Sequence, residues 1–82
     1  MQITISKSEL INQYRNTCDK EYEMTKNAIN NKLFKPKDVI NNSIQRCLGV
    51  ALFIQYLGVT YDDTEKIFEE FKYKINNLRI DN

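Results

Sequence analysis

Apolar residues recur every three or four positions along three long stretches of the chain, and this spacing is typical of amphipathic helices. The first stretch carries an apolar or neutral stripe made of Leu10, Tyr14, Cys18, Tyr22, Thr25 and Ile29. Ser6 precedes it and Glu9 follows three positions later, which is the spacing of a capping box. We therefore expect the first helix over about residues 6–32, preceded by a short N-terminal arm at residues 1–5.

Two further helices are expected after the first. Pro36 suits the first turn of a helix, so the second helix is expected over about residues 36–57. Gly58 is placed to end it in the left-handed conformation, and Thr60 is placed to cap a third helix over about residues 60–78. The buried stripe of the third helix is expected to consist of Thr64, Ile67, Phe68, Phe71, Ile75 and Leu78. The sequence thus predicts a single all-α domain, a three-helix bundle with a short N-terminal arm.

The second half of the second helix is apolar on every side, from Cys47 to Ile54. A helix with apolar residues all round has to be covered all round, and two neighbouring helices leave part of its circumference open. We therefore expect a homodimer in which a second copy covers the open side through Leu48, Val50, Leu52, Phe53 and Tyr56. Gly49 lies in this segment, where glycine costs about 1 kcal/mol relative to alanine, and a close backbone crossing is the usual compensation.

Charge is balanced overall but unevenly distributed. The chain has 12 Lys and Arg against 11 Asp and Glu, so a globally basic nucleic-acid-binding protein is not indicated. Lysines gather around the first connection between helices, and we call Lys32, Lys35 and Lys37 the basic corner. Acidic residues dominate the third helix, and we call Asp62, Asp63, Glu65, Glu69 and Glu70 the acidic face. Each group is either a docking surface for a partner of opposite charge or an ordinary solvated face.

The connection between the second and third helices also suggests a different class of protein. The segment Leu57-Gly58-Val59-Thr60 resembles the turn of helix-turn-helix units, so the alternative function is a small dimeric DNA-binding regulator. The helix that would have to enter the DNA groove, however, carries all five residues of the acidic face and a single positive charge, Lys66. Phosphates repel such a helix. A protein partner is therefore favoured over nucleic acid.

Residue types that support catalysis are scarce. The chain has no His and only two Gly, which excludes His-based general bases, His metal ligands and glycine-rich phosphate loops. Cys18 and Cys47 both fall on apolar stripes and are expected to be core residues. We expect no enzymatic activity, no catalytic residue, no cofactor and no metal. The longest uncharged segment is too short to span a membrane, and no signal-peptide pattern opens the chain, so we expect a cytoplasmic protein.

Segments of the second and third helices, namely 46–53, 56–61 and 71–75, resemble the C-terminal half of small helical proteins from phages and prophages of low-GC Gram-positive bacteria. The resemblance implies a mobile-element setting. In that setting small helical proteins with an acidic face often act by binding a host machine, and inhibitors of CRISPR nucleases are among them. The function expected from the sequence is thus a non-enzymatic protein that binds another macromolecule. One half of a toxin–antitoxin pair is a further alternative.

Overall fold

The computed structural model describes residues 6–32 and 35–78, and it contains three helices within these ranges. Helix α1 spans Lys7–Asn30, α2 spans Pro36–Tyr56 and α3 spans Tyr61–Asn77. The all-α class predicted from the sequence is confirmed, and each predicted boundary lies within two residues of the observed one. The expected N-terminal arm lies outside the described residues.

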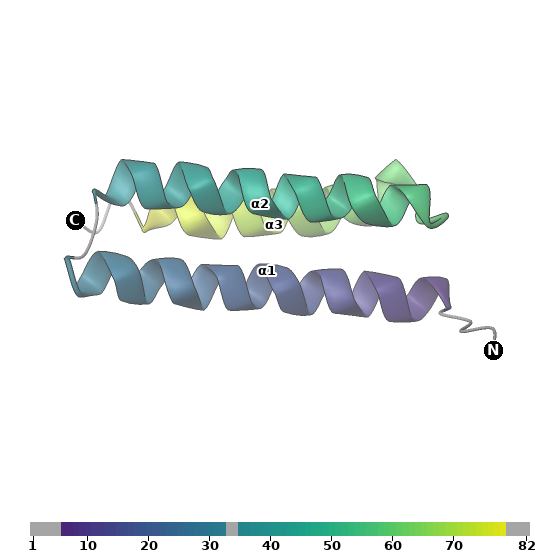
Figure 1. Ribbon diagram of the computed structural model, residues 1–82, viewed down its shortest axis with the longest axis horizontal. Helices are drawn as coiled ribbons and strands as arrows, with labels where there is room; N and C mark the ends of the chain where they lie inside the picture. Colours follow the sequence, from purple (N-terminus) through teal and green to yellow (C-terminus); the bar gives the residue numbers. More distant parts are fainter. Residues whose placement is uncertain (1–5, 33–34, 79–82) are drawn as a thin grey trace.

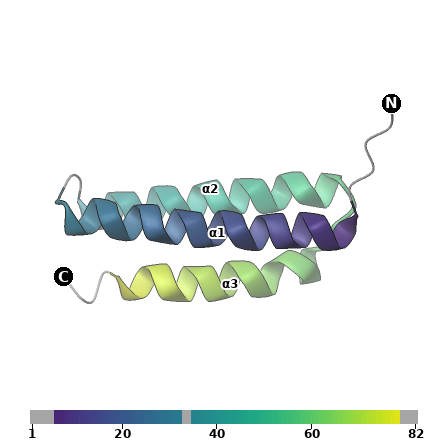
Figure 2. The same ribbon diagram turned by 90° about the horizontal axis from the view of Figure 1, so that it is seen from below.

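The three helices lie alongside one another in an up-down-up order (Figure 1). Every pair of helices is in contact, and α1 packs against both α2 and α3 (Figure 2). Short connections between consecutive helices favour this antiparallel arrangement. Within the part of the chain that the structure describes, no helix carries an apolar stretch long enough to cross a membrane.

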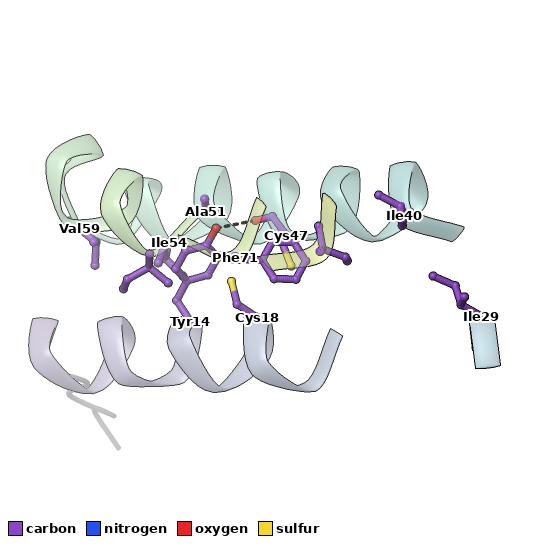
Figure 3. Close-up of a cluster of buried hydrophobic side chains, with 11 residues drawn as sticks. Tyr14, Cys18, Ile29, Ile40, Cys47, Ala51, Ile54, Val59 and Phe71 are labelled. Carbon is purple, nitrogen blue, oxygen red and sulfur yellow. Dashed lines mark hydrogen bonds between the residues drawn. The ribbon is translucent and has the colours of Figure 1, made fainter. Parts of the chain in front are cut away.

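The core forms where the apolar stripes of the three helices meet (Figure 3). Its buried hydrophobic members are Tyr14, Cys18, Ile29, Ile40, Cys47, Ala51, Ile54, Val59, Ile67, Phe71 and Ile75. The stripes predicted for the first and third helices are confirmed, with Leu10, Tyr22, Phe68 and Leu78 at their half-buried margins. The Tyr14 hydroxyl donates a hydrogen bond to the backbone carbonyl of Cys47 at 3.1 Å, which satisfies its polar tip inside the core.

The helix starts are capped as the sequence predicted. The Ser6 hydroxyl accepts a hydrogen bond from the Glu9 backbone N–H at 3.1 Å. At α3 a reciprocal capping box joins Thr60 and Asp63, because each backbone N–H donates to the other side chain. Asp63 also pairs with Lys7 Nζ at 2.9 Å, so the cap ties the start of α3 to the start of α1.

Two residues in the connections adopt the left-handed backbone conformation: Gly58 at φ 104° and Lys32 at φ 56°. A side chain at such a position costs roughly 1–2 kcal/mol, and glycine avoids that cost. We expect Gly58→Ala to lower the free energy of unfolding by about 1 kcal/mol and Lys32→Gly to raise it by a similar amount. A Cβ at Gly58 would meet no atom within 4 Å, so the effect there is purely conformational. Urea denaturation followed by circular dichroism measures the free energy of unfolding of each variant and of the wild type. Variants as stable as the wild type would contradict the prediction.

Candidate interaction surfaces

The side of α2 that faces away from α1 and α3 carries a row of uncovered apolar side chains, which we call the outer stripe. Its members are Leu48, Leu52, Phe53 and Tyr56, with exposed fractions of 38%, 52%, 62% and 91%. Leu52, Phe53 and Tyr56 follow Leu48 by four, five and eight residues, and these spacings place all four side chains on one side of the helix. Four of the five residues predicted for a dimer interface therefore lie together on the surface, uncovered by their own chain.

The fifth predicted interface residue, Val50, lies elsewhere. Its side chain is half-buried and packs against the core of its own chain, because it is turned well away from the centre of the outer stripe. The close backbone crossing expected at Gly49 is also not found within one chain, since a Cβ there would meet no atom within 4 Å. Gly49 is exposed and lies on the same side of α2 as Leu52 and Tyr56.

The structure divides the acidic face into two groups. Asp63 and Glu70 turn toward α1, where Lys7 lies 2.9 Å from Asp63 and Arg15 lies 3.8 Å from Glu70. The hydrogen bond from Lys7, reinforced by Thr60, lowers the pKa of Asp63 below its ordinary value. Asp63 therefore links the start of α3 to α1, whereas the half-exposed pair of Glu70 with Arg15 contributes little.

Asp62, Glu65 and Glu69 form the second group, and all three are exposed. Their spacing of three, four and seven residues places them on one side of α3. Glu69 has a neighbouring cation on its own helix, Lys72 at 3.5 Å. The outward part of the acidic face is therefore narrower than the sequence predicted, and it consists of these three carboxylates.

The basic corner surrounds the connection between α1 and α2. Lys32 follows the C-cap of α1, Lys35 is the N-cap residue of α2 and Lys37 lies in the first turn of α2; all three are exposed. No carboxylate of the described residues lies within ion-pairing distance of these lysines, whereas Arg15 and Arg46 are both paired. The charge of the corner is thus directed to solvent.

A polar network between α1 and α2 was not foreseen from the sequence. The Glu21 carboxylate accepts hydrogen bonds from Arg46 Nε at 3.0 Å, from Arg46 Nη2 at 2.9 Å and from the Ser43 hydroxyl at 2.9 Å. The Ser43 side chain is completely buried. The hydrogen bonds from Arg46 have the largest effect on the pKa of Glu21, and together with the hydrogen bond from Ser43 they lower it. The position of Ser43 within the apolar stripe of α2 was the available sequence signal, because a buried hydroxyl needs a partner.

The buried thiols match the sequence prediction of core residues. Cys18 and Cys47 are both free and buried, and they lie close together in Figure 3. Contact with the Cys18 thiol and burial raise the pKa of Cys47, so its thiol is neutral. Burial likewise raises the pKa of Tyr14. Among residues 6–32 and 35–78, no group of three acidic or cysteine side chains converges to hold a metal ion.

The arrangement of α2 and α3 also bears on the helix-turn-helix alternative. The two helices run alongside one another in both views (Figures 1 and 2). The two helices of a helix-turn-helix unit instead cross at roughly 90–120°. The geometry therefore gives that alternative no support.

This chain matches no protein-family model, no curated protein and no solved structure.

Proposed function

We propose that the chain is a non-enzymatic protein that acts by binding another protein, and that it does so as a homodimer joined through the outer stripe of α2. The observation that carries the proposal is the exposure of Leu52, Phe53 and Tyr56 side by side on one helix. A contiguous apolar patch on a small domain marks an interaction surface.

A second copy of the chain is the occupant that the charge pattern favours. Residues 47–56 of α2 carry no charged side chain. In a two-fold symmetric dimer a patch meets its own copy, so a charge near the axis would face a like charge. An uncharged stripe avoids this repulsion. Gly49, exposed near the N-terminal end of the stripe, would let two α2 backbones approach closely if the helices cross there.

Sedimentation equilibrium over a range of protein concentrations tests the dimer. We expect the wild-type chain to sediment as a dimer and Leu52→Glu to raise the dissociation constant by at least about tenfold, because the carboxylates of both copies would be brought together near the axis. Tyr73→Glu is the matched control, since Tyr73 is 72% exposed on α3 and outside the stripe. A wild-type chain that remains monomeric at the highest attainable concentration would contradict the dimer.

Gly49→Ala tests whether the two α2 helices of the dimer cross at Gly49. Alanine at this exposed helical position should stabilise the isolated helix by about 1 kcal/mol. If two helices cross at Gly49, the same change should weaken association. Greater chain stability together with weaker self-association is the expected pair of results, and unchanged or tighter association would remove Gly49 from the interface.

We propose the outward part of the acidic face as the surface that meets the protein partner. Asp62, Glu65 and Glu69 form a row of negative charge on α3 that could imitate a row of phosphates. A partner with a basic channel for nucleic acid fits this row. Such a partner agrees with the expected phage or mobile-element setting, in which inhibitors of host nucleic-acid-handling systems, including CRISPR nucleases, use surfaces of this kind.

A further inference from the structure

The middle of the bundle holds two thiols that the proposed function does not use. Cys18 lies near the middle of α1 and Cys47 near the middle of α2, and both are free. Their side chains project into the space between the two helices (Figure 3). The two thiols are in hydrogen-bond contact, so their sulfur atoms are neighbours. The only two cysteines of the chain therefore face each other as a pair.

The packing of α1 on α2 suits a covalent bond between these thiols. Packed helices have axes about 8–10 Å apart and Cα atoms about 2.3 Å from each axis, so Cα atoms that face each other lie close to the range of about 4.4–6.8 Å that a disulfide spans. Ala51 lies one turn beyond Cys47 and is also buried, so small side chains let the two helices lie close at this level. A disulfide can therefore form without separating α1 from α2.

Cys18 also lines a surface pocket, which gives a small oxidant a route to its sulfur. The pocket has a volume of about 180 Å³ and lies between α1 and α3, with Tyr22 and Phe71 among its walls. A water molecule takes up about 30 Å³ in the liquid, so a peroxide fits inside. Cys18 is 3% exposed and Cys47 is completely buried. Cys18 is thus the thiol that an oxidant meets first, and only an oxidant close to water in size reaches it.

The contact between the thiols also makes Cys18 the more reactive of the two. The hydrogen bond from Cys47 lowers the pKa of Cys18, and this raises the fraction of thiolate. The thiolate is the form of cysteine that attacks an oxidant. Accessibility and acidity therefore select the same residue.

We propose that Cys18 and Cys47 form a reversible disulfide when the protein meets a peroxide. The Cys18 sulfur attacks one oxygen of the peroxide, the O–O bond breaks, and a sulfenic acid and one water are formed. The Cys47 sulfur then attacks the Cys18 sulfur, the S–O bond breaks, and the Cys47 proton leaves with the hydroxyl group as a second water. The two thiols thus give two electrons to the peroxide. Exchange with a small dithiol reverses the reaction.

The disulfide would fasten α1 to α2. It closes a loop of 30 residues, which restricts the unfolded chain and makes the oxidised protein the more stable form. Cys47 lies on the buried side of α2, away from the outer stripe. The bond would therefore form in a monomer and in a dimer alike, and it changes the stability of the bundle without altering its exposed apolar surface.

The test treats the reduced full chain with hydrogen peroxide in the absence of denaturant. The intact mass is expected to fall by that of two hydrogen atoms, and the protein, when unfolded with N-ethylmaleimide present, should take up no label. A non-reducing gel should show a single chain rather than a cross-linked pair. The melting temperature should rise by about 10 °C or more and return to its first value after treatment with dithiothreitol.

Two variants test which thiol reacts first. Cys47→Ser keeps a hydrogen-bond donor but cannot form the disulfide, so peroxide should leave Cys18 as a sulfenic acid that dimedone captures. Cys18→Ser is the matched control, and its remaining, fully buried thiol should be captured at least about tenfold less. The measurements on the wild type need neither variant, so a variant that fails to fold leaves the test intact.

Oxidised glutathione tests the route of entry, because it is too large for the pocket. For each oxidant, the rate with the folded chain is divided by the rate with the chain unfolded in urea. This ratio should be at least about tenfold lower for oxidised glutathione than for peroxide. Equal ratios would overturn entry through the pocket.

Four further results would overturn the inference: thiols that stay reduced in peroxide, disulfides between chains, oxidation of Cys18 without a disulfide, or a disulfide that fails to raise the melting temperature. Equal capture by dimedone in the two serine variants would remove Cys18 as the attacking thiol. Self-association is measured separately by sedimentation, so failure of the disulfide can be told apart from failure of the dimer.

Discussion

Phe71→Ala is expected to lower the free energy of unfolding by about 3–5 kcal/mol, the largest effect of any single change considered for this chain. Phe71 is 4% exposed and projects from α3 into the core between α1 and α2 (Figure 3). Truncation removes the transfer free energy of the ring and leaves a cavity that three packed helices close only in part. Small domains have total stabilities of about 5–15 kcal/mol, so this loss removes a large part of the free energy of unfolding.

Urea denaturation at a fixed protein concentration measures this effect, because self-association would otherwise shift the apparent stability. Tyr73→Ala is the control on the same helix, where the ring is 72% exposed and its loss should change stability by less than about 0.5 kcal/mol. A Phe71→Ala variant as stable as this control would show that the observed packing of α3 is wrong.

Glu21→Ala is expected to cost about 2–3 kcal/mol, which is unusual for a residue at the edge of a bundle. The change leaves the buried Ser43 hydroxyl without its acceptor and removes both hydrogen bonds from Arg46. An unsatisfied buried hydroxyl accounts for most of the loss, because Arg46 is half-exposed and can be hydrated. Glu23→Ala is the matched control, since Glu23 is exposed on the same helix.

The same network makes stability depend on pH. The folded state lowers the pKa of Glu21, so the carboxylate contributes stability above the unfolded-state pKa of about 4.3, and this contribution is lost as pH falls through the lower folded-state pKa. Glu21→Gln keeps the shape without the charge. The difference in unfolding free energy between wild type and Glu21→Gln should therefore shrink below about pH 4. A difference that stays constant from neutral to acidic pH would contradict a charged role for Glu21.

Periodicity identified the three helices and the buried sides of the first and third. Stripes at three- and four-residue spacing placed Tyr14, Cys18, Ile67 and Phe71 in the core, because the side of a helix that avoids water can be read from one helix at a time. Cap residues such as Thr60 fixed the boundaries for the same local reason.

Features that depend on two helices at once could not be predicted in this way. The pairing of Glu21 with Arg46, and the division of the acidic face into paired and outward carboxylates, depend on the rotation and axial register of one helix against another. The same holds for Val50, whose apolar character gave no indication of which of its neighbours it would meet. Local patterns contain no information on that register.

The short links between consecutive antiparallel helices have a kinetic consequence. Two of the three helix pairs, α1 with α2 and α2 with α3, are neighbours along the sequence, as in other helical bundles, while α3 must also pack on the more distant α1. Chains with such low contact order fold within microseconds to milliseconds. A newly synthesised chain would therefore expose its core side chains to solvent only briefly. Brief exposure limits aggregation of a protein whose outer stripe stays exposed after folding.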